Sequence, residues 1–170
     1  PKVRLRILDA TGSEISEYVK SGEAEFGIDM EGEPDPLIAF EPLAMERYVL
    51  ACRPDHPLAG DTPLHWSSIR EHGAIVLGPN SGIGRQLRAT VPTLDWRFEI
   101  QHLSTLMGFL TNGMGAAVIP SLAMTSVNPA SLVYRPLINP EVKRRIGIIR
   151  RPGAVLSPAA QSLREHVISE

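Results

Sequence analysis

Apolar and polar side chains alternate along residues 3–7, and this period of two predicts a strand. The apolar spacing over residues 15–19 is instead helical. Ser13 is suited to cap the start of that helix, and Gly22 is suited to end it in a left-handed conformation. The chain therefore begins with a predicted strand followed by a predicted helix.

The rest of the chain alternates between short apolar runs and segments with helical spacing, and the acids, glycine and proline of residues 31–36 indicate a loop. We expect strands over residues 24–28, 37–43, 47–53, 74–77, 96–100, 116–119, 132–137 and 145–150, and helices over residues 66–71, 82–89, 105–112 and 157–168. Strands that alternate with helices of about ten residues predict an α/β fold with a mainly parallel sheet.

Part of this pattern occurs twice. The segment over residues 15–29 resembles the segment over residues 106–120 at a constant shift of 91 residues, which carries Gly22 onto Gly113. The apolar positions of the two helices coincide, and a similar strand follows each glycine. Ordered agreement over a helix, a glycine and a strand favours two similar lobes.

The repeat predicts a gap in the first lobe. In the second lobe, a strand, a loop and a helix over residues 74–89 precede the strand over residues 96–100. The shift places the counterpart of that unit before residue 1. We therefore expect the first lobe to lack its opening strand and helix, which agrees with the absence of an initiator methionine.

In each lobe a helix is expected to follow the carboxyl end of a strand, beginning at Ser13 and at Ser104. Open parallel sheets bind ligands at this edge, where the free N–H groups of helix N-termini attract anions. Two lobes joined by two crossing strands would direct these edges toward one another. The sequence thus predicts a cleft for one small molecule, and its donors favour a carboxylate, sulfate-like or phosphate-bearing anion.

The composition is that of an ordinary folded chain: 170 residues, 43% hydrophobic, with a formal net charge of -2. This length leaves room for one domain or two small lobes. No apolar run approaches the roughly 18 residues of a membrane span, and near-neutral charge argues against nucleic-acid contact by this chain alone. The single cysteine, Cys52, excludes a disulfide framework, suits a reducing compartment and is interpreted as an inert buried thiol.

Motifs for cofactors and catalysis are incomplete. Gly82 and Gly84 lack the third glycine of a dinucleotide fingerprint, because Leu87 stands in its place. Ser81 is not in a nucleophile elbow, since Pro79 stands where that motif needs glycine. The five histidines lack the spacing of metal ligands. We therefore predict no cofactor, no metal site and no enzyme activity.

Four segments carry a family resemblance: SGEAEFGI (residues 21–28), PLAMERYVLACRPDHPLAG (42–60), NGMGAAVIP (112–120) and LSPAAQSLREHV (156–167). In this order they resemble the effector-binding domain of LysR-type transcriptional regulators, and the resemblance covers essentially the whole chain. It implies an α/β fold of two Rossmann-like lobes joined by two crossing strands, similar to type 2 periplasmic binding proteins. The implied lobes are residues 1–45 with 146–170, and residues 46–145.

The resemblance implies a cytoplasmic regulator with a small-molecule effector in the cleft between the lobes. DNA would be contacted only by an N-terminal winged helix-turn-helix that lies outside this sequence, and the full-length protein would be a homodimer or homotetramer without membrane contact. The missing first strand and helix put the usual dimer contact and part of the pocket in doubt. A solute-binding protein of a transport system, with the same fold, is the alternative.

The resemblance also implies a hydroxyl group after the first strand that meets an effector carboxylate, and Thr11 holds that position. In the second lobe, Asn80, Ser81 and Gly82 lie between a strand and a helix, where backbone donors are free. His102 is the repeat partner of Thr11. The predicted effector-binding residues are Thr11, Asn80, Ser81, Gly82, Arg85, His102 and Ser104, with Arg85 placed to clamp a carboxylate.

Overall fold

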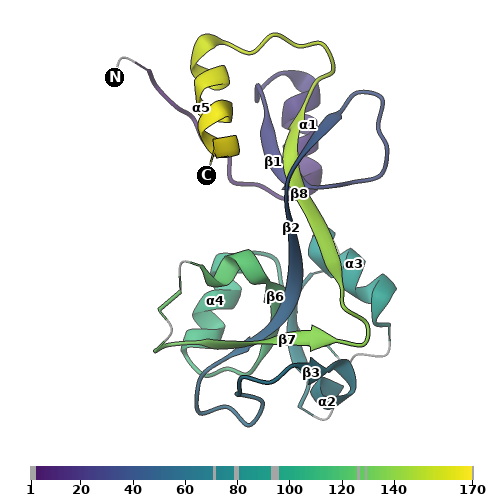
Figure 1. Ribbon diagram of the computed structural model, residues 1–170, viewed down its shortest axis with the longest axis vertical. Coiled ribbons are helices and arrows are strands. Elements are labelled where there is room, and N and C mark those ends of the chain that lie inside the picture. Colours follow the sequence, from purple (N-terminus) through teal and green to yellow (C-terminus); the bar gives the residue numbers. More distant parts are fainter. Residues whose placement is uncertain are drawn as a thin grey trace. The chain divides into compact units, whose positions relative to one another are not determined.

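The chain divides into two compact units, each with its own helices. The computed structural model describes residues 3–70, 72–78, 81–92, 96–125, 127–128 and 130–169. Unit 1 comprises Pro1–Met45 and Arg144–Glu170, and unit 2 is Glu46–Lys143. Two strands run from one unit into the other, β2 (Ala39–Cys52) and β8 (Lys143–Arg150) (Figure 1). The second crossing lies two residues earlier than the boundary expected from the sequence.

Unit 1 contains helix α1 (Gly12–Ser21), strand β1 (Gly27–Met30) and helix α5 (Pro158–Ser169), together with parts of β2 and β8. Strand β1 pairs antiparallel with β8, which lies beside β2. A side chain at Gly147 of β8 would collide with the ring of Phe40 and the carbonyl oxygen of Glu41. Glycine at this position therefore lets the two crossing strands approach closely.

The cap of α1 is Thr11 rather than Ser13, so the predicted start of this helix is wrong. Both the amide nitrogen and the hydroxyl group of Thr11 donate to Oε2 of Glu14, at 2.8 and 2.7 Å. Thr11 has a glutamate three residues later, as a capping box requires, whereas Ser13 is followed at that distance by Ser16. The predicted end is confirmed, because Gly22 is left-handed with φ +83°.

The predicted strand over residues 3–7 does not form. Its apolar side chains are exposed instead, by 55% at Val3, 61% at Leu5 and 87% at Ile7. The shift of 91 residues carries Leu5 onto the first residue of β5 in unit 2, and β5 is held by pairing with β4. Among the described residues of unit 1 no strand corresponds to β4. Alternation alone cannot form a strand without a neighbour to supply hydrogen bonds.

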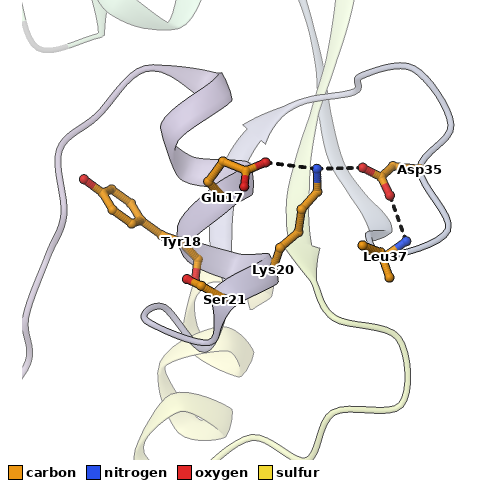
Figure 2. Close-up of polar contacts among 6 residues, drawn as sticks. All are labelled: Glu17, Tyr18, Lys20, Ser21, Asp35 and Leu37. Atoms are coloured by element: carbon orange, nitrogen blue, oxygen red, sulfur yellow. Dashed lines mark hydrogen bonds and ion pairs between the residues drawn. The ribbon is translucent and has the colours of Figure 1, made fainter.

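Lys20 ties α1 to the loop over residues 31–36 (Figure 2). Its ammonium group lies 2.8 Å from Asp35 and 3.2 Å from Glu17, and the amide of Leu37 donates to Asp35 at 2.8 Å. Hydrogen bonding to Asp35, and then to Glu17, raises the pKa of Lys20. Hydrogen bonding to Lys20, and then to the Leu37 amide, lowers the pKa of Asp35. The predicted loop is thus held against the helix by charge.

Unit 2 is built on a sheet in the order β2-β6-β4-β5, with β7 on the other side of β2. Its further elements are β3 (Leu64–His65), α2 (Trp66–Arg70), β4 (Ala74–Leu77), α3 (Gly82–Thr90), β5 (Trp96–Ile100), α4 (Leu103–Thr111), β6 (Ala117–Pro120), a 3-10 helix (Ser121–Met124) and β7 (Val133–Ile138). Parallel pairing joins β6, β4 and β5, whereas β2 runs antiparallel to β6 and β7. The prediction of a mainly parallel sheet is wrong for this reason, and the sheet is mixed.

The two expected strands over residues 37–43 and 47–53 are the single strand β2. Between them Ala44, Met45 and Glu46 include no turn-forming residue, so the chain continues extended across the boundary between the units.

Unit 2 has a dense apolar core of its own. Its fully buried large side chains are Tyr48, Leu50, Ile69, Ile75, Leu87, Leu106, Leu110, Ile119, Leu132 and Leu137. Cys52 is buried with them, and burial raises the pKa of its thiol, which disfavours the reactive thiolate. In the part of the chain that the structure describes, no helix is long and apolar enough to cross a membrane.

The internal repeat is present in the backbone. The shift of 91 residues carries Thr11, the cap of α1, onto His102, the cap of α4. It also carries Gly22 onto Gly113, and both glycines have positive φ, +83° and +74°. Each glycine is followed by a short strand, β1 or β6. The helix-and-strand unit is therefore used once in each half of the chain.

Candidate functional site

Two helices of unit 2 begin at the same edge of the sheet. Strands β4 and β5 are parallel neighbours that end in register, with Leu77 beside Ile100. Immediately afterwards the amide of Gly78 donates to the carbonyl of Ile100 at 2.9 Å. The segments that lead to α3 and α4 therefore leave the carboxyl edge of the sheet side by side, where open α/β sheets bind their ligands.

Ser81 caps α3, which begins at Gly82 as the sequence predicts. Its hydroxyl group donates to the carbonyl of Gly78 at 2.8 Å and accepts from the amide of Gly84 at 2.9 Å. The first α-helical bond runs from Arg85 N to Ser81 O. The amides of Gly82 and Ile83 precede that bond, so the helix itself supplies them with no acceptor. They are the backbone donors that α3 presents at the edge of the sheet.

Gly84 seats α3 directly on the end of β4. A Cβ atom at this position would collide with the carbonyl oxygens of both Leu77 and Gly78. These are backbone atoms, so they cannot move aside as a flexible side chain could. In the sequence, Gly84 stands out only as part of an incomplete nucleotide motif. The available signal was a small residue in the first turn of a helix that follows a strand, where close packing requires glycine.

The cap of α4 is His102 rather than Ser104, so the predicted start of this helix is also two residues late. The amide of Leu106 donates to the carbonyl of His102 at 3.1 Å, and the imidazole makes no capping hydrogen bond. Ser104 is exposed at the second helical position. The first turns of α3 and α4 contain no acidic residue, so neither helix dipole is neutralised by its own sequence.

Gln101 joins the two segments and was missed from the sequence. Its side-chain amide occupies the space where a side chain at Gly78 would begin. A polar residue directly after a parallel strand is the signal that could have identified it, because such residues line the carboxyl edge of the sheet.

Thr11, the candidate residue of unit 1, lies close to acidic side chains. The hydroxyl proton of Thr11 is used in its bond to Glu14, and a side chain at Gly12 would meet the carboxylate of Asp29. Two acids therefore surround the N-terminus of α1 and reduce its attraction for an anion. Thr11 can still accept a hydrogen bond, but it is a weaker donor than the sequence suggests.

Two further candidates lie beside the caps. Arg85 is exposed in the first turn of α3. Asn80 lies outside the residues that the structure describes. Of the predicted residues, Ser81, Gly82 and Arg85 thus lie at the start of α3, and His102 and Ser104 lie at the start of α4, after neighbouring parallel strands.

A hollow of about 420 Å³ lies at the opposite end of α4. It is lined by Arg53, Pro54, Asp55, Thr111, Ala130 and Ser131. The guanidinium group of Arg53 is bonded to Asp55 at 3.0 Å and to the carbonyl of Thr111 at 3.4 Å. The hydrogen bond between Arg53 and Asp55 raises the pKa of Arg53 and lowers the pKa of Asp55. Because Arg53 is already paired with the carboxylate of Asp55, this hollow is a poorer anion site than the helix starts.

Comparison with known proteins connects these features to a family. The family described as "LysR substrate binding domain" matches residues 1–170. The uncharacterized HTH-type transcriptional regulator YbhD of Escherichia coli (strain K12) is 39% identical over 165 residues, covering 95% of this chain and 52% of YbhD. The chain thus spans about half the length of that relative.

Solved structures show the same fold. The CcmR regulatory domain of Synechocystis PCC6803, in complex with 2-PG, superposes with a TM-score of 0.79 at 20% identity, covering 94% of this chain and 79% of that domain. The effector binding domain of QuiR, in complex with shikimate, gives a TM-score of 0.74 at 16% identity, with 94% and 78% covered.

Proposed function

The chain belongs to the LysR substrate binding domain family, and from this membership we propose that it is the effector-sensing part of a bacterial transcription regulator. The expected two-lobed fold, similar to type 2 periplasmic binding proteins, is confirmed by the likeness to regulatory domains of this family. The relatives are transcriptional regulators rather than enzymes or transport proteins, so the solute-binding alternative is not favoured.

The effector we propose is a small anion, bound at the helix starts of unit 2. The observation that carries this proposal is the pair of adjacent helix starts in unit 2, neither of which has an acid in its first turn. Their free amides can hold a carboxylate, phosphate or sulfate-like group. The proposed contacts in unit 2 are the amide of Gly82, the caps Ser81 and His102, and the side chains of Asn80, Arg85 and Ser104. Thr11, the remaining predicted residue, stays a candidate of unit 1 and can offer a hydrogen-bond acceptor.

This chain spans about half of its relatives' length, so what the whole protein does is proposed as well. We infer that DNA is contacted by a helix-turn-helix elsewhere in the full-length protein, which acts in the cytoplasm as a homodimer or homotetramer and carries out no catalysis. An effector that binds one arrangement of the lobes more tightly would change how the DNA-binding segments sit on a promoter.

A ligand screen on the full-length protein tests this function. Small carboxylates and phosphates, neutral compounds and cations are compared by thermal shift at equal concentration. We expect one or a few anions to raise the melting temperature, because a ligand at 100 times its dissociation constant stabilises the folded state by about 2.7 kcal/mol. Stabilisation by neutral or cationic compounds alone would contradict the anionic effector.

A further inference from the structure

Gln86, in the middle of α3, connects this helix to two other elements through one amide group. The hydroxyl group of Tyr48 donates to Oε1 of Gln86 at 2.8 Å. On its other side, Nε2 of Gln86 donates to the carbonyl oxygen of Lys143, also at 2.8 Å. Tyr48 is only 1% exposed, so its hydroxyl bond is made inside the fold.

Both partners lie where the chain passes between the units. Tyr48 is in β2, two residues after the first residue of unit 2, and Lys143 is the last residue of unit 2 and the first of β8. The amide of Tyr48 also donates to the carbonyl of Val142 at 3.1 Å. The three residues Tyr48, Gln86 and Lys143, which we call the crossing relay, therefore tie α3 to both crossing strands at the boundary.

The chemistry of the crossing relay requires a primary amide. A backbone carbonyl such as that of Lys143 can only accept, so its partner must donate. The oxygen on the same side chain is then free to accept from Tyr48. Glutamine supplies a donor and an acceptor together, whereas glutamate offers only acceptors when ionised and leucine offers neither.

We propose that Gln86 is a positioning residue that transmits a change at the N-terminus of α3 to the two crossing strands. The inference rests on the proposed function, because it gives the effector site a physical connection to the lobe boundary. Gln86 lies one helical turn after Gly82, and a nine-residue helix moves as a rigid rod over that distance. A shift of the first turn of α3 therefore displaces the amide group that both strands share.

Three substitutions separate the effects of the two hydrogen bonds in the crossing relay. Gln86→Glu keeps the acceptor for Tyr48 and loses the donor to Lys143. Tyr48→Phe removes the other bond and keeps the donor. Gln86→Leu removes both. Gln161→Leu makes the same change on α5, where the side chain of the glutamine donates to Glu165 in the same helix, and serves as the matched control.

Hydrogen exchange of the full-length protein, followed by mass spectrometry on peptides that cover residues 46–50 and 143–147, tests the transmission. Ser81→Ala, which removes the cap of α3, is combined with each variant. In the Gln86 background we expect the cap removal to raise exchange in both peptides about fivefold, the factor that corresponds to the typical loss of about 1 kcal/mol for one N-cap. In the Gln86→Leu background the same cap removal is expected to add nothing. Gln161→Leu should leave the response to Ser81→Ala unchanged.

An equal response to Ser81→Ala with and without Gln86 would overturn the proposal, because a purely structural glutamine gives additive effects. If Gln86→Leu does not fold, Gln86→Glu decides the matter, with the response expected to be lost only in the peptide over residues 143–147. These measurements need no effector and no promoter. A protein that fails to bind anions would disprove the proposed function without changing the exchange ratios.

Discussion

Replacing Gly84 with alanine is expected to lower the free energy of unfolding by about 1–3 kcal/mol, the range for overpacking a filled site. The added methyl group would collide with the backbone carbonyl oxygens of Leu77, the last residue of β4, and of Gly78, which follows it, and neither can rotate away. To make room, α3 must lift from the sheet, which also displaces the amide of Gly82. Urea unfolding of the variant and the wild type measures the change.

Gly108→Ala is the matched control, because Gly108 lies within α4 and a Cβ atom there would meet nothing within 4 Å. Alanine has the higher helix propensity, so this variant is expected to be more stable than the wild type by up to about 1 kcal/mol. The same substitution should thus have opposite signs in two helices of one unit. If Gly84→Ala were as stable as Gly108→Ala, α3 would not be seated on β4 as described.

Replacing Ser104 with aspartate is expected to weaken binding of the anionic effector at least tenfold while leaving the domain folded. The new carboxylate would lie at the second position of α4, beside the amides proposed to hold the ligand. Two like charges 5 Å apart repel by about 3 kcal/mol at an effective dielectric constant of 20. An acid at a helix start interacts favourably with the dipole, so the melting temperature should stay level or rise. Calorimetric titration with an anion identified by the ligand screen measures the affinity.

Ser104→Asn separates charge from shape. Asparagine has nearly the size of aspartate but no charge, so its effect on affinity should be several times smaller. Equal affinity of the aspartate variant and the wild type would remove the start of α4 from the effector site. Loss of affinity in both variants to the same extent would mean that Ser104 contributes through shape and not through its electrostatic environment.

Most helices and strands could be predicted, because their signals come from residues that are close together in the sequence. The shift between residues 15–29 and residues 106–120 predicts the paired helices and the glycines that follow them, and both glycines have positive φ in the structure. The caps were misplaced because Ser13 and Ser104 are good N-cap types, yet the capping box belongs to Thr11 and an extended residue, His102, stands before α4. A residue type alone does not identify the last non-helical residue.

Features that depend on distant partners could not be predicted in the same way. Residues 3–7 alternate correctly, but a strand needs a neighbour, and the described part of unit 1 has none beside them. Gly84 is required by the end of β4, and Gln101 is placed by its contact with Gly78. Gln86 gives no local signal, because both its partners are more than 30 residues away in sequence.

The central claim is that an anion binds at the starts of α3 and α4, and a ligand footprint by hydrogen exchange tests it most directly. The full-length protein is exchanged with and without a stabilising anion from the ligand screen, and fragmentation resolves the protected amides. The account predicts protection concentrated at residues 82–83 and 103–105. Protection around Arg53, Thr111 and Ser131, at the opposite end of α4, with none at the helix starts, would contradict it.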